Sequence, residues 1–289
     1  MNPWIEAARP KTLSAGIVPV FVGSALAFHD GHFHLLIFFA CLIGALTLQI
    51  ATNYINDASD FLKGADTHER LGPKRMAQAG LLTPKALFIG AGLMFALATF
   101  CGIYLISQAG LFILAIGIFS ILGAIAYTAG PFPLAYYGLG DFFVLLFFGV
   151  IAVCGTYFSH TTYFSLSSLI SSLIVGLSSV AIIAVNNTRD ILEDSKTHKR
   201  TLAVRFGENG SKNYFQLILY FSFLLTLILA VYLKSYTLLL PFLTLPLARQ
   251  NIIKMKNAKS GENYNQLLAS TAKFQLIFCF LLGLALIYY

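Results

Sequence analysis

Charged residues are scarce in this sequence. Asp, Glu, Lys and Arg fill only 11% of its 289 positions, whereas 57% are hydrophobic. An ordinary soluble domain carries roughly 25% charged residues, so the composition excludes a protein of that class. Apolar stretches of membrane-spanning length recur from one end of the chain to the other, which predicts a polytopic membrane protein.

Cysteines and linkers are also few. The cysteines stand singly inside apolar runs, without the spacing of a metal site or a disulfide framework, and we expect them to be small buried side chains. No tract rich in Pro, Gly or Ser divides the chain, so we expect residues 1–289 to form a single transmembrane domain. The first apolar run contains Pro19 and is followed directly by further spans, which favours a membrane helix over a cleavable signal peptide. The four cysteines are Cys41, Cys101, Cys154 and Cys279.

The apolar stretches predict an all-α fold with about nine transmembrane helices. The first and the eighth stretches are short, and Pro241 and Pro246 interrupt the eighth. The predicted spans are 13–28, 35–56, 85–106, 110–127, 141–158, 166–187, 214–233, 236–248 and 267–287.

Lysine and arginine are distributed unevenly between the alternate loops. All but Lys234 of the 19 Lys and Arg residues fall at the N-terminus, after the second and sixth spans, or before the last span and in its first turns, where Lys273 lies. By the positive-inside rule these segments face the cytoplasm, so the N-terminus is cytoplasmic and the C-terminus lies outside. Of the twelve acidic residues only Asp30 falls on the outer side. The net charge of +7 therefore belongs to the cytoplasmic face and does not indicate a groove for nucleic acid.

Two clusters of Asn and Asp each follow a long apolar run. Within each cluster, pairs spaced i,i+4 project their oxygens from one face of a helix. Carboxylates held so closely repel each other and are costly to desolvate near a bilayer, and a divalent cation removes both penalties. Mg²⁺ is usually held by one or two carboxylates together with substrate phosphates, so two such clusters on one membrane face predict a metal-bridged diphosphate. The clusters consist of Asn53, Asn56, Asp57, Asp60 and Asp66, and of Asn186, Asn187, Asp190 and Asp194.

Basic residues at the cytoplasmic edges of the spans suit the binding of such an anion. Arginine would grip the non-bridging diphosphate oxygens bidentately and lysine as a point charge. Each of these residues could equally serve only to set the membrane topology. The candidates are Lys11, Arg75, Lys199 and Arg200.

The segment 127–141 contains no Lys or Arg, unlike the other cytoplasmic segments. Its Gly and Pro residues predict turns, and the missing topology charge indicates that it packs over the site. Tyr127 and Tyr137 could hold their electron-rich rings near a developing cation or belong to an interfacial aromatic belt. Asp141 opens a span, where a carboxylate indicates a functional site. On the outer side, the run from His29 to His34 superficially resembles a metal cluster, but we interpret it as a structural loop.

These motifs resemble those of the UbiA superfamily of intramembrane aromatic prenyltransferases, and most closely its 1,4-dihydroxy-2-naphthoate polyprenyltransferase branch of menaquinone synthesis. The resemblance extends in order from near residue 8 to residue 205. The matching runs are Ala8-Arg9-Pro10-Lys11-Thr12-Leu13, Asn53-Tyr54-Ile55-Asn56-Asp57-Ala58-Ser59-Asp60, Lys63-Gly64-Ala65-Asp66, Gly72-Pro73-Lys74-Arg75, Tyr127-Thr128-Ala129-Gly130-Pro131, Gly138-Leu139-Gly140-Asp141, Asn186-Asn187-Thr188-Arg189-Asp190 and Lys199-Arg200-Thr201-Leu202-Ala203-Val204-Arg205.

The resemblance implies nine helices around a central cavity that is capped on the cytoplasmic side and opens laterally to lipid. It also implies that the two Asp motifs hold Mg²⁺ on the prenyl diphosphate, with Lys199 and Arg75 near contacting positions. The ubiquinone-type pattern places its third Asp four residues after the second, whereas Asp66 follows Asp60 by six. This departure favours the naphthoate branch and makes Asp66 the least secure ligand. The implied metal ligands are Asp57, Asp60, Asp66, Asp190 and Asp194.

The implied activity is electrophilic prenylation of an aromatic ring. A polyprenyl group would pass from polyprenyl diphosphate to 1,4-dihydroxy-2-naphthoate, with loss of diphosphate and carbon dioxide, to give a demethylmenaquinone. The implied setting is the bilayer of a bacterial inner membrane, with a cytoplasmic active site. The groups expected to take part in catalysis are Asp57, Asp60, Asp190, Asp194 and Tyr127.

Other functions stay open from the residues alone. The acceptor could be 4-hydroxybenzoate or homogentisate. A cation transporter would place carboxylates near the bilayer midplane, beside broken helices, whereas this sequence places them at the ends of spans. A non-catalytic lipid-binding scaffold requires no paired Asp clusters.

Overall fold

The apolar stretches form helices because a segment inside a bilayer must satisfy its own backbone hydrogen-bonding groups. The computed structural model describes residues 2–64, 75–127, 129, 133–197 and 199–289, without the side chain of Lys11. Every regular element in these ranges is helical, and none is a strand, which confirms the predicted all-α class. The elements are α1 (Pro3–Ala8), η1 (Pro10–Thr12), α2 (Ser14–His29), α3 (Leu35–Leu62), α4 (Pro84–Ala109), α5 (Phe112–Ala126), η2 (Leu134–Tyr137), α6 (Gly140–Val144), η3 (Leu145–Cys154), α7 (Gly155–Thr161), α8 (Leu166–Arg189), α9 (Ile191–Lys196), α10 (Leu202–Leu233), η4 (Tyr236–Thr244), α11 (Leu245–Asn257) and α12 (Gly261–Ile287).

Six segments of the described chain are long and apolar enough to cross a membrane, and α2 and α5 are shorter apolar helices. Together they account for eight of the nine predicted spans. The remaining span, 236–248, forms the 3₁₀ helix η4 and the beginning of α11. Proline removes a backbone donor from a helix, which explains why this stretch is not one long α-helix. The predicted count of nine membrane spans is therefore not confirmed. The six segments are Leu35–Leu62, Pro84–Ala109, Gly140–Thr161, Leu166–Arg189, Leu202–Leu233 and Gly261–Ile287.

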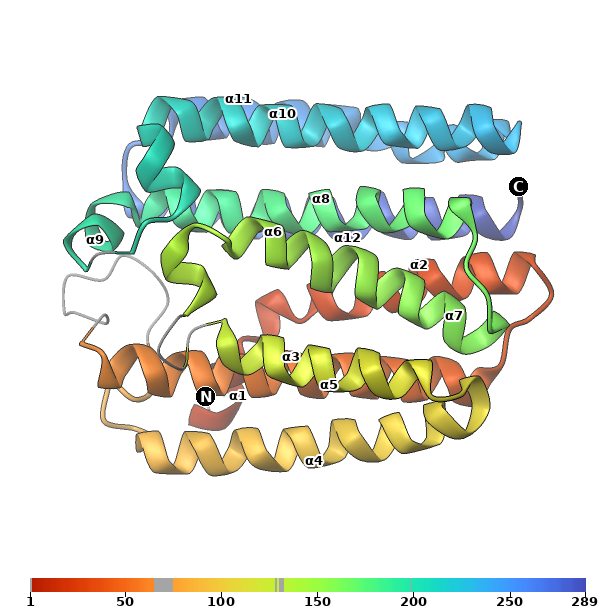
Figure 1. Ribbon diagram of the computed structural model, residues 1–289. Coiled ribbons are helices and arrows are strands. Elements are labelled where there is room, and N and C mark those ends of the chain that lie inside the picture. Colours follow the sequence, from red (N-terminus) through yellow and green to blue (C-terminus); the bar gives the residue numbers. More distant parts are fainter. Residues whose placement is uncertain (1, 65–74, 128, 130–132, 198) are drawn as a thin grey trace.

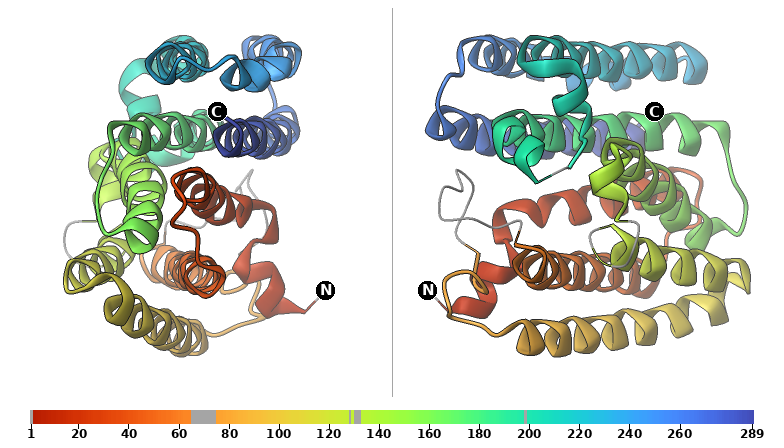
Figure 2. Two further views of the ribbon diagram at one scale, coloured as in Figure 1. Left: turned by 90° about the vertical axis from the view of Figure 1, so that its right-hand side faces the viewer. Right: turned by 60° about the vertical axis from the view of Figure 1, so that its left-hand side comes forward.

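The long helices run side by side along one axis (Figure 1). The end of α3, the start of α4 and the short helix α9 lie at the left of this view. The α2–α3, α4–α5 and α7–α8 connections and the C-terminus lie at the right (Figure 1). Seen along the axis, α3, α4 and α5 occupy one part of the bundle, whereas α8, α10, α11 and α12 occupy another (Figure 2). The two Asn/Asp clusters therefore share one end of the bundle.

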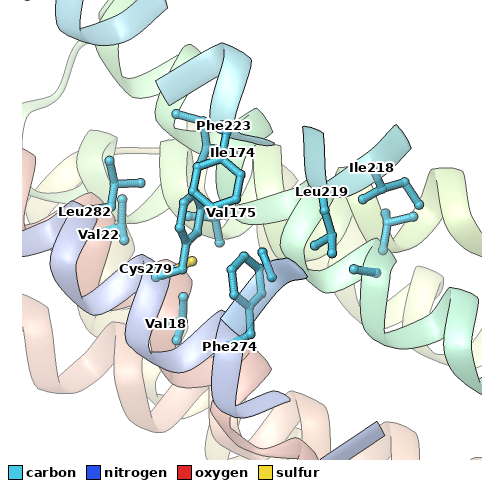
Figure 3. Packing of buried hydrophobic residues seen from close by; sticks show 14 of the residues in the cluster. Val18, Val22, Ile174, Val175, Ile218, Leu219, Phe223, Phe274, Cys279 and Leu282 are labelled. Carbon is cyan, nitrogen blue, oxygen red and sulfur yellow. The ribbon is translucent and has the colours of Figure 1, made fainter. Parts of the chain in front are cut away.

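The largest core joins α2, α8, α10 and α12 (Figure 3). Phe223 of α10 meets Phe278 of α12 edge to face, with ring centroids 5.1 Å apart, and Phe274 stacks on Phe278 at 5.2 Å. Because lipid tails are as apolar as these side chains, burial alone does not hold the helices together in a bilayer. Their association depends on close packing and on interhelical hydrogen bonds. This core fixes α8, which carries Asn186 and Asn187 of the second cluster and leads directly to Asp190.

One helix contact depends on two glycines that let backbones approach closely. A Cβ atom placed on Gly149 would lie 2.6 Å from the carbonyl oxygen of Ser172 and 2.9 Å from the Cα of Gly176. Gly149 belongs to η3, which is π-helical, a rare geometry that is frequent at functional sites. Small residues at such crossings are typical of membrane helices. The contact holds η3 tightly against α8.

Gly149→Ala should therefore force η3 away from α8 and destabilise the protein by about 1–3 kcal/mol through overpacking. Thermal unfolding in detergent micelles would measure the change. Gly102→Ala in α4 is the matched control, because no heavy atom lies within 4 Å of the added methyl group. If both variants melted with the wild-type protein, the close contact would have no role in stability.

Candidate active site

A cavity of about 480 Å³ extends along the bundle and is lined by residues from Arg9 to Ala272. A site of this size falls within the range of small-molecule pockets. Every charged side chain that lines it within the described part of the chain comes from the end where the two clusters lie. Towards the other end the wall consists mainly of Ala, Gly, Ile, Leu and Phe from α3, α4, α5 and η3. The charged residues in the lining are Arg9, Asp60, Asp141 and Lys199.

Asp57 is fully occupied by the backbone of a distant segment. α3 extends to Leu62, so Asp57 lies within a helix, and its carboxylate is 2% exposed. Its Oδ2 accepts the backbone N–H of Met76 at 2.9 Å, and its Oδ1 accepts that of Ala77 at 3.1 Å. Asp57 thereby fixes the turn that carries Arg75, and it does not line the cavity.

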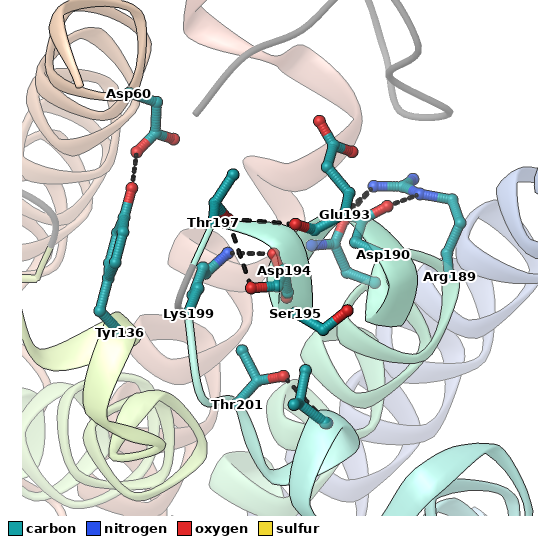
Figure 4. Close-up of polar contacts among 12 residues, drawn as sticks. Asp60, Tyr136, Arg189, Asp190, Glu193, Asp194, Ser195, Thr197, Lys199 and Thr201 are labelled. Carbon is teal, nitrogen blue, oxygen red and sulfur yellow. Dashed lines mark hydrogen bonds and ion pairs between the residues drawn. The ribbon is translucent and has the colours of Figure 1, made fainter. Parts of the chain in front are cut away.

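Asp60, one turn further along α3, lines the cavity. Its Oδ2 forms a buried ion pair with Nη2 of Arg75 at 2.9 Å. Its Oδ1 accepts a long hydrogen bond of 3.4 Å from the hydroxyl of Tyr136 (Figure 4). The first cluster thus divides between Asp57, which organises the backbone, and Asp60, which faces the site.

The second cluster is not carried by one continuous helix. α8 ends at Arg189, and a separate short helix, α9, follows Asp190. The guanidinium of Arg189 binds both oxygens of Asp190, with Nε–Oδ1 at 2.7 Å and Nη2–Oδ2 at 2.8 Å. The same guanidinium donates to the side-chain oxygens of Asn186 and Asn265. The i,i+4 stacking that we expected for Asn186 and Asp190 is therefore replaced by a network centred on Arg189.

Asp194 is the least satisfied carboxylate of the second cluster. Its Oδ1 pairs with Nζ of Lys199 at 3.2 Å, whereas the buried Oδ2 has no hydrogen-bond partner (Figure 4). Burial raises the pKa of the Asp194 carboxyl to about 6 against the attraction of Lys199, and the charge of Asp190 adds to the rise. Burial alone would lower the pKa of Lys199, but its attraction to Asp194 and Asp60 outweighs this and raises it. A further cation would relieve the under-compensated charge on Asp194.

The donor set fits Mg²⁺ held jointly with a diphosphate. Within the described residues no three His, Cys, Asp or Glu side chains converge on a site that could hold a metal ion alone. Magnesium does not need such a cage, because it usually takes one or two carboxylates and completes its shell with phosphate oxygens and water. Asp60 and Asp194 offer one carboxylate from each cluster, and Asp194 has an open buried oxygen. Asp66 lies outside the described residues.

Most of the other predicted site residues also reach the cavity. Asn53, which donates to the carbonyl of Ala8 at 2.9 Å, lines it. The hydroxyl of Tyr127 lies within electrostatic range of Asp141, Asp60 and Asp194. The remaining predicted residues that line the cavity are Asn56, Tyr127, Asp141, Asn186 and Lys199.

Besides Asp57, four predicted residues of the described chain do not line the cavity, namely Arg75, Asp190, Asp194 and Arg200, and the side chain of Lys11 is not described. The Arg75 guanidinium is directed at Asp60. Arg200 is exposed. Its contact with the neighbouring segment is made by its backbone N–H, which donates to the carbonyl of Tyr136 at 2.8 Å. Lys11 lies in η1, and its side chain is outside the described part of the chain.

Three functional candidates were missed by reasoning from sequence. Arg9 lines the cavity from a left-handed conformation (φ 55°), which is rare for a residue other than glycine and is typical of functional sites. The Arg9-Pro10 pair was a usable signal, since a helix rarely continues past the residue before a proline. Tyr136 gave no signal, because its partner Asp60 is 76 residues away in the chain. Arg189 binds its sequence neighbours Asn186 and Asp190 as well as the distant Asn265, so its spacing from the cluster was a usable signal.

The profile of the UbiA prenyltransferase family matches residues 16–277. This chain is a member of that family. The family prediction made from the motifs is thus confirmed, and with it an integral membrane protein of the prenyltransferase class.

Relatives of known activity are similar over nearly the whole chain. The 1,4-dihydroxy-2-naphthoate octaprenyltransferase of Haemophilus influenzae is 36% identical, and the match covers 99% of this chain and 96% of that protein. The Bacillus subtilis enzyme of the same name is 31% identical, over 98% of this chain and 91% of that protein.

Solved structures share the fold at low sequence identity. A UbiA homologue from Archaeoglobus fulgidus, bound to GPP and Mg²⁺, matches with a TM-score of 0.67 and 14% identity, over 99% of this chain and all of that one. The apo structure of a homologue from Aeropyrum pernix matches with a TM-score of 0.69 and 15% identity, over 96% of this chain and 98% of that one. These likenesses establish the UbiA fold for this chain.

Asp57→Asn should loosen the segment that begins at Arg75. The asparagine would turn an N–H group towards one of the two backbone donors, leaving a buried group unsatisfied at a cost of about 1–3 kcal/mol. Hydrogen exchange at the amides of Met76 and Ala77 would report this directly. Asp60→Asn, one turn away, should leave these two amides protected. Unchanged exchange in Asp57→Asn would contradict the role assigned to this carboxylate.

Proposed function

We propose that this protein transfers a polyprenyl group from polyprenyl diphosphate to 1,4-dihydroxy-2-naphthoate, with release of diphosphate and carbon dioxide, to give a demethylmenaquinone in its reduced, quinol form. The observation that carries the proposal is the cavity, which joins a charged end to a long apolar stretch. Such a shape suits an amphiphile with an anionic head and a hydrocarbon tail. The names of two relatives that match nearly the whole chain support naphthoate as the acceptor.

The diphosphate would lie at the charged end, between Asp60 and Asp194. Bound Mg²⁺ would neutralise the charge that develops on the diphosphate as it departs. Lys199, and Arg75 behind Asp60, would stabilise the same charge, which is usually the largest contribution to catalysis. Arg9, across the cavity, has the planar fork that suits a carboxylate such as that of the acceptor.

The transfer exchanges one bond for another on the prenyl carbon. The bond from this carbon to the diphosphate oxygen breaks, and its electron pair leaves with the diphosphate. A ring carbon of the acceptor then supplies the electron pair for the new carbon–carbon bond. Loss of the carboxyl group as carbon dioxide returns an electron pair to the ring, so no net proton transfer is required. Tyr127 would place its ring near the allylic cation, and the apolar wall would exclude water from it.

We further propose that residues 1–289 act as one catalytic domain in the bacterial inner membrane, with the N-terminus and the site on the cytoplasmic side and the C-terminus outside. The distribution of Lys and Arg supports this orientation. Both acidic clusters lie at one end of the bundle, and Tyr289 stacks on His29 at the other, which agrees with it.

The acceptor is tested by comparing three aromatic acids as substrates in separate incubations. Membranes containing the protein would be incubated with a labelled prenyl diphosphate and with 1,4-dihydroxy-2-naphthoate, 4-hydroxybenzoate or homogentisate in turn. We expect labelled product, with stoichiometric carbon dioxide, only from the naphthoate. Transfer to one of the other two acids but not to the naphthoate would replace the proposed acceptor and retain the prenyltransferase.

Asp60→Asn and Asp194→Asn should each lower turnover by roughly 100-fold or more, the scale for losing one electrostatic contact to a transition state. Rates would be measured at saturating Mg²⁺ on purified protein in detergent. Glu262→Gln removes the same charge from an exposed position at the beginning of α12 and should turn over normally. Turnover near the wild-type rate in both Asp variants would remove them from the metal site.

A further inference from the structure

Tyr136 connects the two acidic clusters, although it belongs to neither. It lies at the end of the short helix η2, in the segment between α5 and α6. Its hydroxyl donates to Oδ1 of Asp60 at 3.4 Å. Figure 4 shows this pair facing Lys199 and Asp194 across the site.

The ring of Tyr136 also interacts with two lysines, one near each cluster in the sequence. Nζ of Lys63, which follows α3, lies over the ring at 5.1 Å from its centroid. Nζ of Lys199, which follows α9, lies over it at 5.9 Å. Both distances fall within the range in which an aromatic face attracts a cation. The electron-rich ring of Tyr136 thus attracts both ammonium groups.

The backbone holds this ring firmly in place. The carbonyl of Tyr136 accepts the N–H of Arg200 at 2.8 Å, and the carbonyl of Tyr137 accepts Nη2 of Arg205 at 2.7 Å. Gly138 makes this docking possible: its φ is +78°, and a Cβ atom there would lie 2.7 Å from the carbonyl oxygen of Arg200. The segment containing Tyr136 is therefore fastened to the segment containing Lys199.

We propose that Tyr136 is a positioning residue that holds the ammonium groups of Lys63 and Lys199 at the diphosphate-binding end of the cavity before the substrate arrives. This rests on the proposed function, because it takes the diphosphate to bind between the two clusters. Preorganised charges need no rearrangement when an anion binds, so the ring improves the affinity for the diphosphate. The acceptor ring binds elsewhere in the cavity and is unaffected.

The test compares Tyr136→Leu with Tyr136→Phe and with Tyr137→Leu. The leucine removes the aromatic face, and two contacts at the weak end of the cation–π range correspond to about a tenfold loss of affinity. The phenylalanine keeps the face and removes the hydroxyl that makes the long hydrogen bond to Asp60, so it should bind within about threefold of the wild type. Neither tyrosine is part of the cavity lining, but Tyr137 is 50% exposed, and its leucine variant should bind normally.

The primary measurement is the Mg²⁺-dependent dissociation constant of farnesyl thiolodiphosphate, a non-hydrolysable analogue, by calorimetry in detergent. Thermal unfolding without Mg²⁺ and the KM for the acceptor are measured on the same preparations. We expect Tyr136→Leu to weaken analogue binding while its unfolding temperature and its acceptor KM match those of Tyr136→Phe. Analogue binding equal to wild type, or a weakening shared equally by Tyr137→Leu, would overturn the proposal. So would a loss of analogue binding accompanied by an equal loss of stability, which would mark a purely structural role.

The binding measurement separates this proposal from the proposed function. If the wild-type protein failed to prenylate the naphthoate but bound the analogue, the acceptor would be wrong and Tyr136 could still be assessed. If the wild-type protein turned over and Tyr136→Leu bound the analogue normally, only the role of Tyr136 would fail.

Discussion

The structure depends on the compensation of buried carboxylates at the end of a membrane bundle. An uncompensated carboxylate there is costly because little water reaches it. Each described aspartate of the two clusters has a partner, and the partners differ in kind. Asp57 is held by the backbone N–H groups of Met76 and Ala77, Asp60 by Arg75, Asp190 by Arg189, and Asp194 by Lys199.

The kind of partner separates the aspartates that hold the backbone from those that are available to a ligand. Both oxygens of Asp57 accept main-chain N–H groups, and both oxygens of Asp190 are bound by the bidentate guanidinium of Arg189. They hold the turn before α4 and the break between α8 and α9. Asp194 keeps a buried oxygen without a partner, and Asp60 opens onto the cavity. A site for a charged ligand requires this incomplete compensation, because a carboxylate whose oxygens are all hydrogen-bonded gains little further stabilisation when a ligand binds.

Much of the fold could be predicted from the sequence because a segment inside a bilayer must satisfy its own backbone hydrogen-bonding groups, which leaves few structures besides a helix. Runs of apolar residues located eight helices, and the spacing of Asn53, Asp57 and Asp60 placed them correctly on one helix. The Lys and Arg pattern placed both clusters at one end. The eighth predicted span, 236–248, is the exception. Pro241 converts an expected span into a 3₁₀ helix followed by α11.

The site was predicted less completely, for a related reason. Residue types and spacing indicated which side chains could bind metal and diphosphate, but not which of them would be used to hold the backbone. The partners of Asp57 lie 19 and 20 residues away in the chain. In the prediction from sequence, Arg189 counts only as one of the positive charges that set the membrane topology. In the structure its guanidinium binds Asp190 and so rearranges the second cluster. Tyr136 acquires its place only when the segment before α6 docks on the segment before α10. Such contacts leave no periodic signature in the sequence.

The continuity of the cavity affects how the products of the proposed reaction would separate. Besides carbon dioxide, the products are a small polyanion, the diphosphate, and an apolar prenylated quinol. Chemistry at the boundary between the charged end and the apolar wall would release them into different phases, the anion to water and the quinol to lipid. The reverse reaction would need both to return to the same point from opposite directions. The shape of the cavity would thus help to make the transfer one-way.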